Sequence, residues 1–212
     1  MNIFVRWTII LLVAASIILL VFPVPWFPSF YDVRYMGWAA LGGAVLISVL
    51  PWLARVREGT PDAGRKNKAV DSLQIFLAFL VASNAFGDLG LYKLYKFGFE
   101  YDKILHFLAP FLGVVFISIF LRGRFGIGKM RAIVVAVSIF LICGVVWEAY
   151  EYLADMYLKT HISGVYGLNI SQDTKFDILF DFAGSALGAI GVAVLWNKIF
   201  LKLGKSADSV RQ

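Results

Sequence analysis

Residues 132–152 read AIVVAVSIFLICGVVWEAYEY, and the first sixteen of them carry no charge. A transmembrane helix needs about 20 consecutive, mostly apolar residues. Because the apolar residues run continuously instead of alternating, they favour a helix over a strand of a membrane β-barrel. Five further stretches have the same character: 3–22, 36–54, 70–89, 104–121 and 176–196. The sequence therefore predicts an all-α, polytopic bundle of six transmembrane helices.

The composition of the chain agrees with a membrane protein. Of its 212 residues 60% are hydrophobic and 16% are charged, whereas soluble domains average about 25% charged residues. The first stretch carries Arg6, as a signal peptide would, but no A-x-A-like cleavage site follows it, and we interpret it as a retained span. We expect one integral membrane domain over 1–212, with two N-terminal spans (1–69), a four-span core (70–197) and a basic cytoplasmic tail (198–212).

The distribution of charge predicts how the bundle is oriented. If both termini are cytoplasmic, 14 of the 20 Lys and Arg residues lie inside and six outside. The positive-inside rule then favours an N-in, C-in, multi-pass protein of the inner (plasma) membrane. The basic inner loops suit anionic lipid, and we expect the lipid bilayer as partner and no nucleic acid. Ten of the 14 acidic residues lie on or near the outer half, a bias that this rule does not explain.

Ionisable residues recur at helical spacing on the last three spans. Intervals of three or four residues place side chains on one helix face, and such residues within a span are costly enough to be functional hypotheses by default. They are Asp102 and His106 with Lys103 on the fourth span, Glu148, Glu151 and Asp155 on the fifth, and Asp173, Asp177 and Asp181 on the sixth. Each set lies in the predicted outer half, so we expect the three faces to meet.

The residue types suggest a site for chemistry or ions. Carboxylates outnumber nearby cations, so the site needs a metal ion, a cationic ligand or bound protons. We predict that the catalytic residues are His106, Glu148 and Asp181. We predict that substrate or an ion is bound by Asp102, Lys103, Glu151, Asp155, Asp173 and Asp177. A divalent metal, the expected cofactor, would be held by His106, Glu148, Glu151, Asp177 and Asp181.

Structural interpretations stay open for several of these residues. Asp102 and Asp173 fall where helices begin, so each is also a candidate N-cap. Lys103 is also readable as an ordinary loop charge, and Asp155 as a solvated interfacial one. Glycines at intervals of three or four residues favour a small-residue packing face over a binding loop; they are Gly184, Gly188 and Gly191.

Three motifs carry a family resemblance over residues 70–192. They are Tyr101-Asp102-Lys103-Ile104-Leu105-His106-Phe107, then Trp147-Glu148-Ala149-Tyr150-Glu151, then Asp173 to Asp177 with Asp181, Gly184 and Gly188. Together they resemble the YjdF-like family of bacterial inner-membrane proteins of unknown function. More distantly they are similar to the VanZ-like family, which is associated with teicoplanin resistance. VanZ-like proteins carry Gln where this chain has Glu151 and Asn where it has Asp181. The resemblance implies a polytopic inner-membrane protein and supplies no reaction.

Three classes of function fit the sequence. The first is metal-dependent chemistry on a lipid or lipid-linked envelope substrate. The second is a proton- or cation-coupled transporter, although the chain shows no internal repeat of the transporter kind. The third is a non-catalytic membrane protein that binds envelope precursors. A homodimer is compatible with all three, and the sequence carries no H-E-x-x-H motif, nucleophile elbow or Gly-rich phosphate loop.

The predicted topology can be tested with a scan of reporter fusions. We expect fusions near Lys93 and Ile162 to report an outside location and fusions near Lys66 and Gly126 an inside location, because of the Lys and Arg asymmetry. The C-terminus should report inside. An outside C-terminus would contradict the orientation and move the acidic residues to the cytoplasmic half.

Overall fold

Six long helices make up almost all of the protein in a computed structural model that describes residues 1–27, 30, 32–158 and 169–208, with side chains up to residue 198. The helices are α1 (Ile3–Val21), α2 (Val33–Ala54), α3 (Ala63–Asp88), α4 (Tyr101–Phe125), α5 (Lys129–Leu158) and α6 (Ile170–Asp208). Two short 3-10 helices connect them, η1 (Val24–Trp26) and η2 (Leu91–Phe97). All six long helices are apolar and long enough to cross a membrane, and the described residues contain no strand. The predicted all-α bundle of six spans is confirmed.

The helices extend beyond the apolar stretches that predict them. Helix α3 begins at Ala63 and α6 at Ile170, several residues before the expected starts at 70 and 176. Backbone hydrogen bonding continues along the helix after the apolar residues end, and water at the membrane surface solvates the polar side chains there. Two helices begin with N-cap residues. The Asn2 side chain accepts a hydrogen bond from the Phe4 N–H at the start of α1, and the Asp32 side chain accepts one from the Tyr35 N–H at the start of α2.

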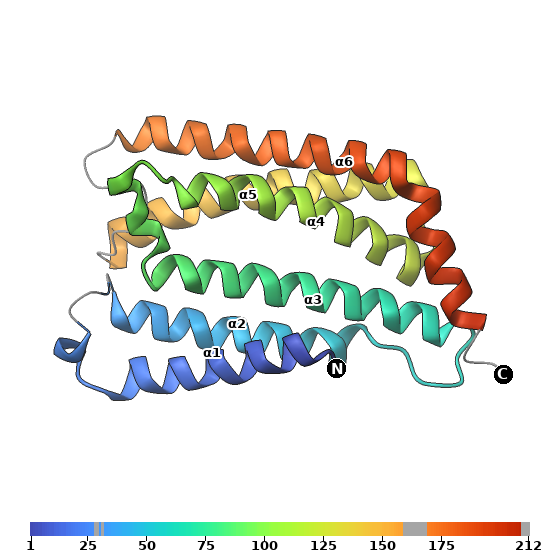
Figure 1. Ribbon diagram of the computed structural model, residues 1–212, viewed down its shortest axis with the longest axis horizontal. Helices are drawn as coiled ribbons and strands as arrows, with labels where there is room; N and C mark the ends of the chain where they lie inside the picture. The colour runs from blue at the N-terminus through green and yellow to red at the C-terminus, as the bar shows by residue number, and fades with distance from the viewer. Residues whose placement is uncertain (28–29, 31, 159–168, 209–212) are drawn as a thin grey trace.

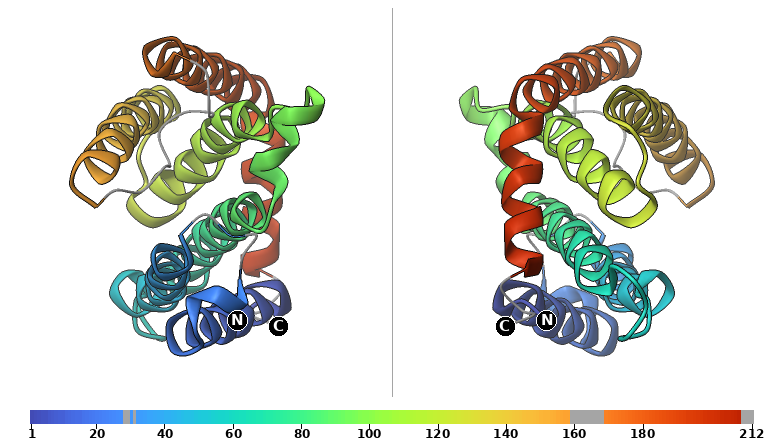
Figure 2. Two further views of the ribbon diagram at one scale, coloured as in Figure 1. Left: turned by 90° about the vertical axis from the view of Figure 1, so that its left-hand side faces the viewer. Right: turned by 90° about the vertical axis from the view of Figure 1, so that its right-hand side faces the viewer.

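The helices form two groups that meet along α3 and α4. Helices α1 and α2 pack on each other and on α3, α4 lies between α3 and α6, and α5 packs on α4 and α6; the end-on views of Figure 2 show this arrangement. The expectation that the last three spans are neighbours is confirmed. Helix α5 reaches the first group through the Tyr150 hydroxyl, which donates to the Tyr35 hydroxyl on α2 at 3.3 Å.

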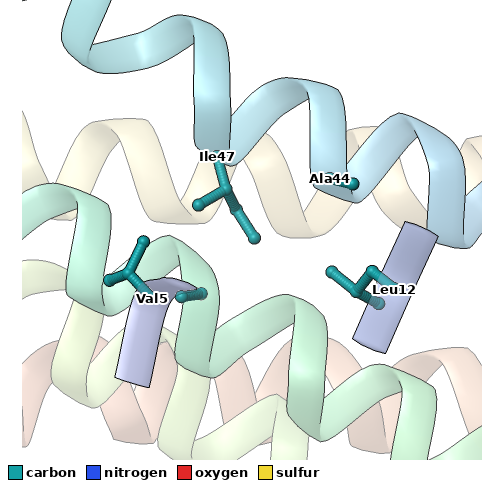
Figure 3. Close-up of a cluster of buried hydrophobic side chains, with 5 residues drawn as sticks. Val5, Leu12, Ala44 and Ile47 are labelled. Carbon is teal, nitrogen blue, oxygen red and sulfur yellow. The ribbon is translucent and has the colours of Figure 1, made fainter. Parts of the chain in front are cut away.

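Each group has its own apolar core. Figure 3 shows the first, where Val5 and Leu12 of α1 meet Ala44 and Ile47 of α2, with Ala78 of α3 in the same cluster. The second core joins α4, α5 and α6 and consists of Val114, Ile133, Ala136 and Val192. In water, each Å² of apolar surface buried in such cores would stabilise the fold by about 25 cal/mol. In a bilayer, where lipid is equally apolar, close packing takes over that role.

Different helix ends lie at the two ends of the bundle. The start of α1 and the C-terminal part of α6, which bends across the bundle, lie toward one end, whereas η2 and the starts of α4 and α6 lie at the other (Figure 1). This arrangement is the one that an even number of spans produces. Which end faces the cytoplasm remains a prediction from the charge distribution.

Small residues let α4 and α6 approach closely. A Cβ atom added at Gly184 would meet the backbone carbonyl of Phe107, and one added at Gly188 would lie 2.6 Å from the carbonyl oxygen of Phe111. The small-residue packing face is therefore confirmed for these two glycines. It is wrong for Gly191, where an added Cβ meets nothing within 4 Å, so the close contact does not extend that far along the helix.

We expect Gly184→Ala to lower the free energy of unfolding by about 1–3 kcal/mol, the usual cost of overpacking. The obstacle is backbone, which cannot move aside as a side chain can. Gly191→Ala is the matched control on the same helix and should leave stability unchanged or raise it slightly, because Ala is the better helix former. Thermal unfolding of the detergent-solubilised protein measures both variants. Equal effects of the two substitutions would contradict the close approach.

Candidate functional site

The site is built where α4 and α6 begin and α5 nears its end. Helix α4 starts at Tyr101, so Asp102 lies in its first turn and Glu100 occupies the N-cap position. At the start of α6 the Asn169 side chain accepts a hydrogen bond from the Ser171 N–H at 3.0 Å. The interpretation of Asp102 and Asp173 as N-caps is therefore wrong. Both carboxylates lie in the first turn of their helices, where a negative charge interacts favourably with the positive end of the helix dipole.

Lys103 is the buried cation at the centre of this site. Its Nζ lies 2.5 Å from Asp173 Oδ1, 2.6 Å from Asp177 Oδ1 and 3.4 Å from Asp102 Oδ2. The Lys103 side chain is 9% exposed and that of Asp177 4%, so the alternative of a loop charge is wrong. The pairs tie α4 to α6 with charge-assisted hydrogen bonds.

His106 lies one turn further along α4 and contacts all three helices. Its Nδ1 is 3.2 Å from Asp181 Oδ1, within hydrogen-bonding distance. Its Nε2 lies 3.8 Å from an oxygen of each of Asp102, Glu148 and Asp177. A separation of 3.8 Å is too long for a hydrogen bond. One ring nitrogen therefore has a partner, and the other faces three carboxylate oxygens at a common distance.

Two oxygens at this place are buried without a hydrogen-bond partner. They are Oε1 of Glu148 and Oδ2 of Asp181, in side chains that are 9% and 10% exposed. Thr174 supplies one hydrogen bond to the Glu148 carboxylate. A Cβ atom added at Gly144 would collide with Asp181 Oδ2, so the glycine on α5 makes room for that carboxylate. Unpartnered buried oxygens are costly and call for an explanation.

The remaining predicted residues continue the same face of α5. Glu151 is half-buried, and the Trp147 side chain hydrogen-bonds to it. Asp155 lies seven residues beyond Glu148 and is also half-buried. Over the described ranges, the carboxylates within 4 Å of His106 do not include either of them. The structure thus brings most of the predicted set together and leaves these two beyond its centre.

The compact group differs in part from the ligand set expected from the sequence. Asp102, His106 and Asp177 each offer one atom such that the three atoms lie within 4.8 Å of one another. From the sequence, Asp102 is expected to bind substrate or an ion and Glu151 to be a ligand. Thr174 has no sequence signal beyond its place between Asp173 and Lys175 near the start of α6.

Acidic groups outnumber basic groups in the site. Five carboxylates surround Lys103 and His106, namely Asp102, Glu148, Asp173, Asp177 and Asp181. Charges of one sign repel strongly in surroundings of low effective dielectric constant. The arrangement is suited to hold a further cation.

Six apolar helices with a buried ionic cluster define a polytopic α-helical membrane protein. The chain belongs to the family described as "Predicted membrane protein (DUF2238)", whose family model matches residues 5–198 and so reaches into all six spans. No curated protein and no solved structure matches the chain. The description names a class of protein and no reaction, and the function therefore has to be argued from the site.

A double-mutant cycle measures how strongly Lys103 and Asp173 are coupled. Lys103→Met or Asp173→Asn alone should destabilise the protein, by about 3–5 kcal/mol if the pair behaves as other buried pairs do. Together they should cost clearly less than the sum, with a coupling energy of about 1–3 kcal/mol.

The control cycle uses Arg65 and Asp62, an exposed pair 3.1 Å apart at the start of α3, and that start lies at the opposite end of the bundle from the start of α4 (Figure 1). Its coupling should stay below about 1 kcal/mol because solvent screens it. Thermal unfolding of all variants in detergent gives both energies. Additive effects at Lys103 and Asp173 would show that the buried pair does not join α4 to α6.

Proposed function

We propose that this protein is a membrane metalloprotein with a divalent-cation site at His106. One observation carries the proposal: His106 Nε2 faces oxygens of Asp102, Glu148 and Asp177, each at 3.8 Å. Ligand atoms around a tetrahedral ion with bonds of about 2.0–2.2 Å lie about 3.3–3.6 Å apart. The ligand atoms of Asp102, His106 and Asp177 lie within 4.8 Å of one another, so they would have to move about an ångström closer together to share one ion.

The surroundings of His106 support the same proposal. Histidines that bind a metal through one nitrogen usually donate the other N–H to a carboxylate, which fixes the tautomer and aims the ring. Asp181, 3.2 Å from Nδ1, is placed for that role. In this arrangement the ligands are His106, Asp102 and Asp177, Glu148 lies beside them at 3.8 Å from His106 Nε2, and Asp181 orients the ring. One imidazole with several carboxylates suits zinc, manganese or iron.

The chemistry we propose is metal-assisted cleavage or transfer at a phosphoryl or ester group. A bound divalent ion polarises such an oxygen and makes a bound water more acidic. Glu148 contributes a buried oxygen without a partner, which can accept the proton of that water when the carboxylate is not itself a ligand. These roles for His106, Glu148 and Asp181 follow the assignment made from the sequence.

We propose a lipid or lipid-linked envelope molecule as the substrate class. The site lies between membrane helices, at the end of the bundle that the charge distribution places outside. The flanking helices expose large apolar side chains such as Leu153 and Leu179, which suits access from the bilayer. The resemblance to YjdF-like and, more distantly, VanZ-like proteins agrees with an envelope role in the inner membrane.

A second candidate is proton- or cation-coupled transport. Its support is the shared oxygen Asp177 Oδ1, which lies 2.6 Å from Lys103 Nζ and 3.8 Å from His106 Nε2. A carboxylate between two basic groups is a usable step of a proton relay. Proton flux in liposomes that contain the purified protein separates the two candidates, because a metalloenzyme does not require it.

Elemental analysis of the full-length protein, purified in detergent without chelator, tests the metal site. We expect near-stoichiometric zinc, manganese or iron that a chelator removes and added metal restores. His106→Ala should lower metal affinity by at least about tenfold, and Glu148→Gln should also weaken binding. Asp62→Asn, which removes an exposed carboxylate elsewhere, is the matched control and should bind metal as the wild type does.

Two results would contradict the proposal. One is a protein without metal to which zinc, manganese, iron, magnesium or calcium cannot be added. The other is a bound metal that neither His106→Ala nor Glu148→Gln disturbs, since the ion would then lie elsewhere.

A further inference from the structure

One oxygen of the site would have to bind two cations at once, the lysine and a metal ion beside His106. Asp177 Oδ1 accepts a hydrogen bond from Lys103 Nζ at 2.6 Å, and the same atom is one of the oxygens that face His106 Nε2. Asp102 divides the task instead, with Oδ2 toward Lys103 and Oδ1 toward His106. Lys103 and a bound metal ion would therefore compete for a single atom, Asp177 Oδ1.

A metal ion bound to that oxygen would come close to the lysine. With a metal–oxygen bond of about 2.1 Å and the observed lysine contact, the two cations would lie about 4 Å apart. The Lys103 side chain is 9% exposed, so water screens this repulsion poorly. The two cations cannot both use Asp177 Oδ1 without a marked loss of binding free energy.

Lys103 also pairs with a second carboxylate, which can remain its partner when Asp177 binds a metal ion. Asp173 Oδ1 lies 2.5 Å from Nζ, and in the described part of the chain Asp173 makes no contact with His106 within 4 Å. Glu148 Oε1, which is buried without a hydrogen-bond partner, lies 3.8 Å from His106 Nε2, and no ion pair within 4 Å joins it to Lys103 among the described residues.

We propose that Lys103 is a resident counter-cation that a divalent metal must displace from Asp177, and that it thereby sets the affinity of the site. This inference rests on the proposed function and adds its regulation. The ammonium group neutralises part of the acidic cluster when no metal is bound. Metal entry moves it onto Asp173, so metal binding is weaker and more readily reversed than the carboxylates alone would make it. Lys103 is in this sense a positioning residue and not a ligand.

The test is the dissociation constant for Mn²⁺ and for Zn²⁺ alone, measured by titration of the full-length protein in detergent. Lys103→Met should bind at least tenfold more tightly than the wild type, because the competing charge is gone. Lys103→Arg keeps the charge and should bind as weakly as the wild type or more weakly. A residue with a purely structural role would not produce a gain in affinity that the charge-conserving variant abolishes.

Two further variants control the measurement. Lys175→Met removes an exposed lysine in the first turns of α6 and should change the affinity by less than about twofold, because solvent screens its charge. Where Lys103→Met folds poorly, the charge-balanced pair Lys103→Met/Asp173→Asn is compared with Asp173→Asn alone, and the same tenfold gain is expected.

The outcomes separate the two proposals. If the wild type binds metal and removal of Lys103 gives no gain in either comparison, the displacement of Lys103 is overturned and the metal site stands. If neither the wild type nor any Lys103 variant binds metal, both are overturned. Tight binding that appears only after Lys103 is removed supports the competition and contradicts metal binding by the unaltered protein.

Discussion

A lysine ammonium group buried among three carboxylates is the constraint on which the architecture at this end of the bundle depends. Lys103 and its partners tolerate burial only because each charge has an opposite one within hydrogen-bonding or ion-pairing distance. That requirement fixes the register of α4 against α6. The glycines of α6 serve the same register, since they bring the two backbones close enough for a short aspartate to reach the lysine. The ionic contacts and the glycine contacts therefore each specify the same pairing of α4 with α6.

Much of the fold follows from hydropathy alone. Six apolar stretches suffice to predict six helices, because a bilayer leaves a spanning segment no other way to satisfy its backbone. The helix ends are harder to predict, since α3 and α6 begin in polar residues whose hydropathy resembles that of a loop. Neighbour relations among the last three spans also follow, because polar faces avoid lipid. The glycine pattern is a weaker guide, and it misplaced Gly191, where spacing indicates a face but not how far along that face the contact extends.

The candidate site could be predicted as a region and not as a set of contacts. Helical spacing shows that Glu148 and Glu151 share a face, yet it does not tell which of them lies level with His106. That depends on the relative heights of α4 and α5, which the sequence does not encode locally. The same holds for Asp102, which looks like a cap by position and proves to lie within the cluster. Lys103 is the clearest case, since a lysine next to a helix start has the same local signal whether it is solvated or buried.

The three helices that surround the site are not held in place by equally many interactions. Helices α4 and α6 are held together by ion pairs and by glycine contacts, whereas α5 has the smallest buried share of the six spans, 17%. Among the described carboxylates within 4 Å of His106, α5 supplies Glu148 alone, and the hydroxyl pair of Tyr150 and Tyr35 joins that helix to α2. An outward displacement of this end of α5, away from the core residues Ile133 and Ala136 that pack its other half against α4 and α6, would break that hydrogen bond. The displacement would carry Glu148 away from His106 and leave the lysine pairs intact, because Lys103, Asp173 and Asp177 lie on α4 and α6.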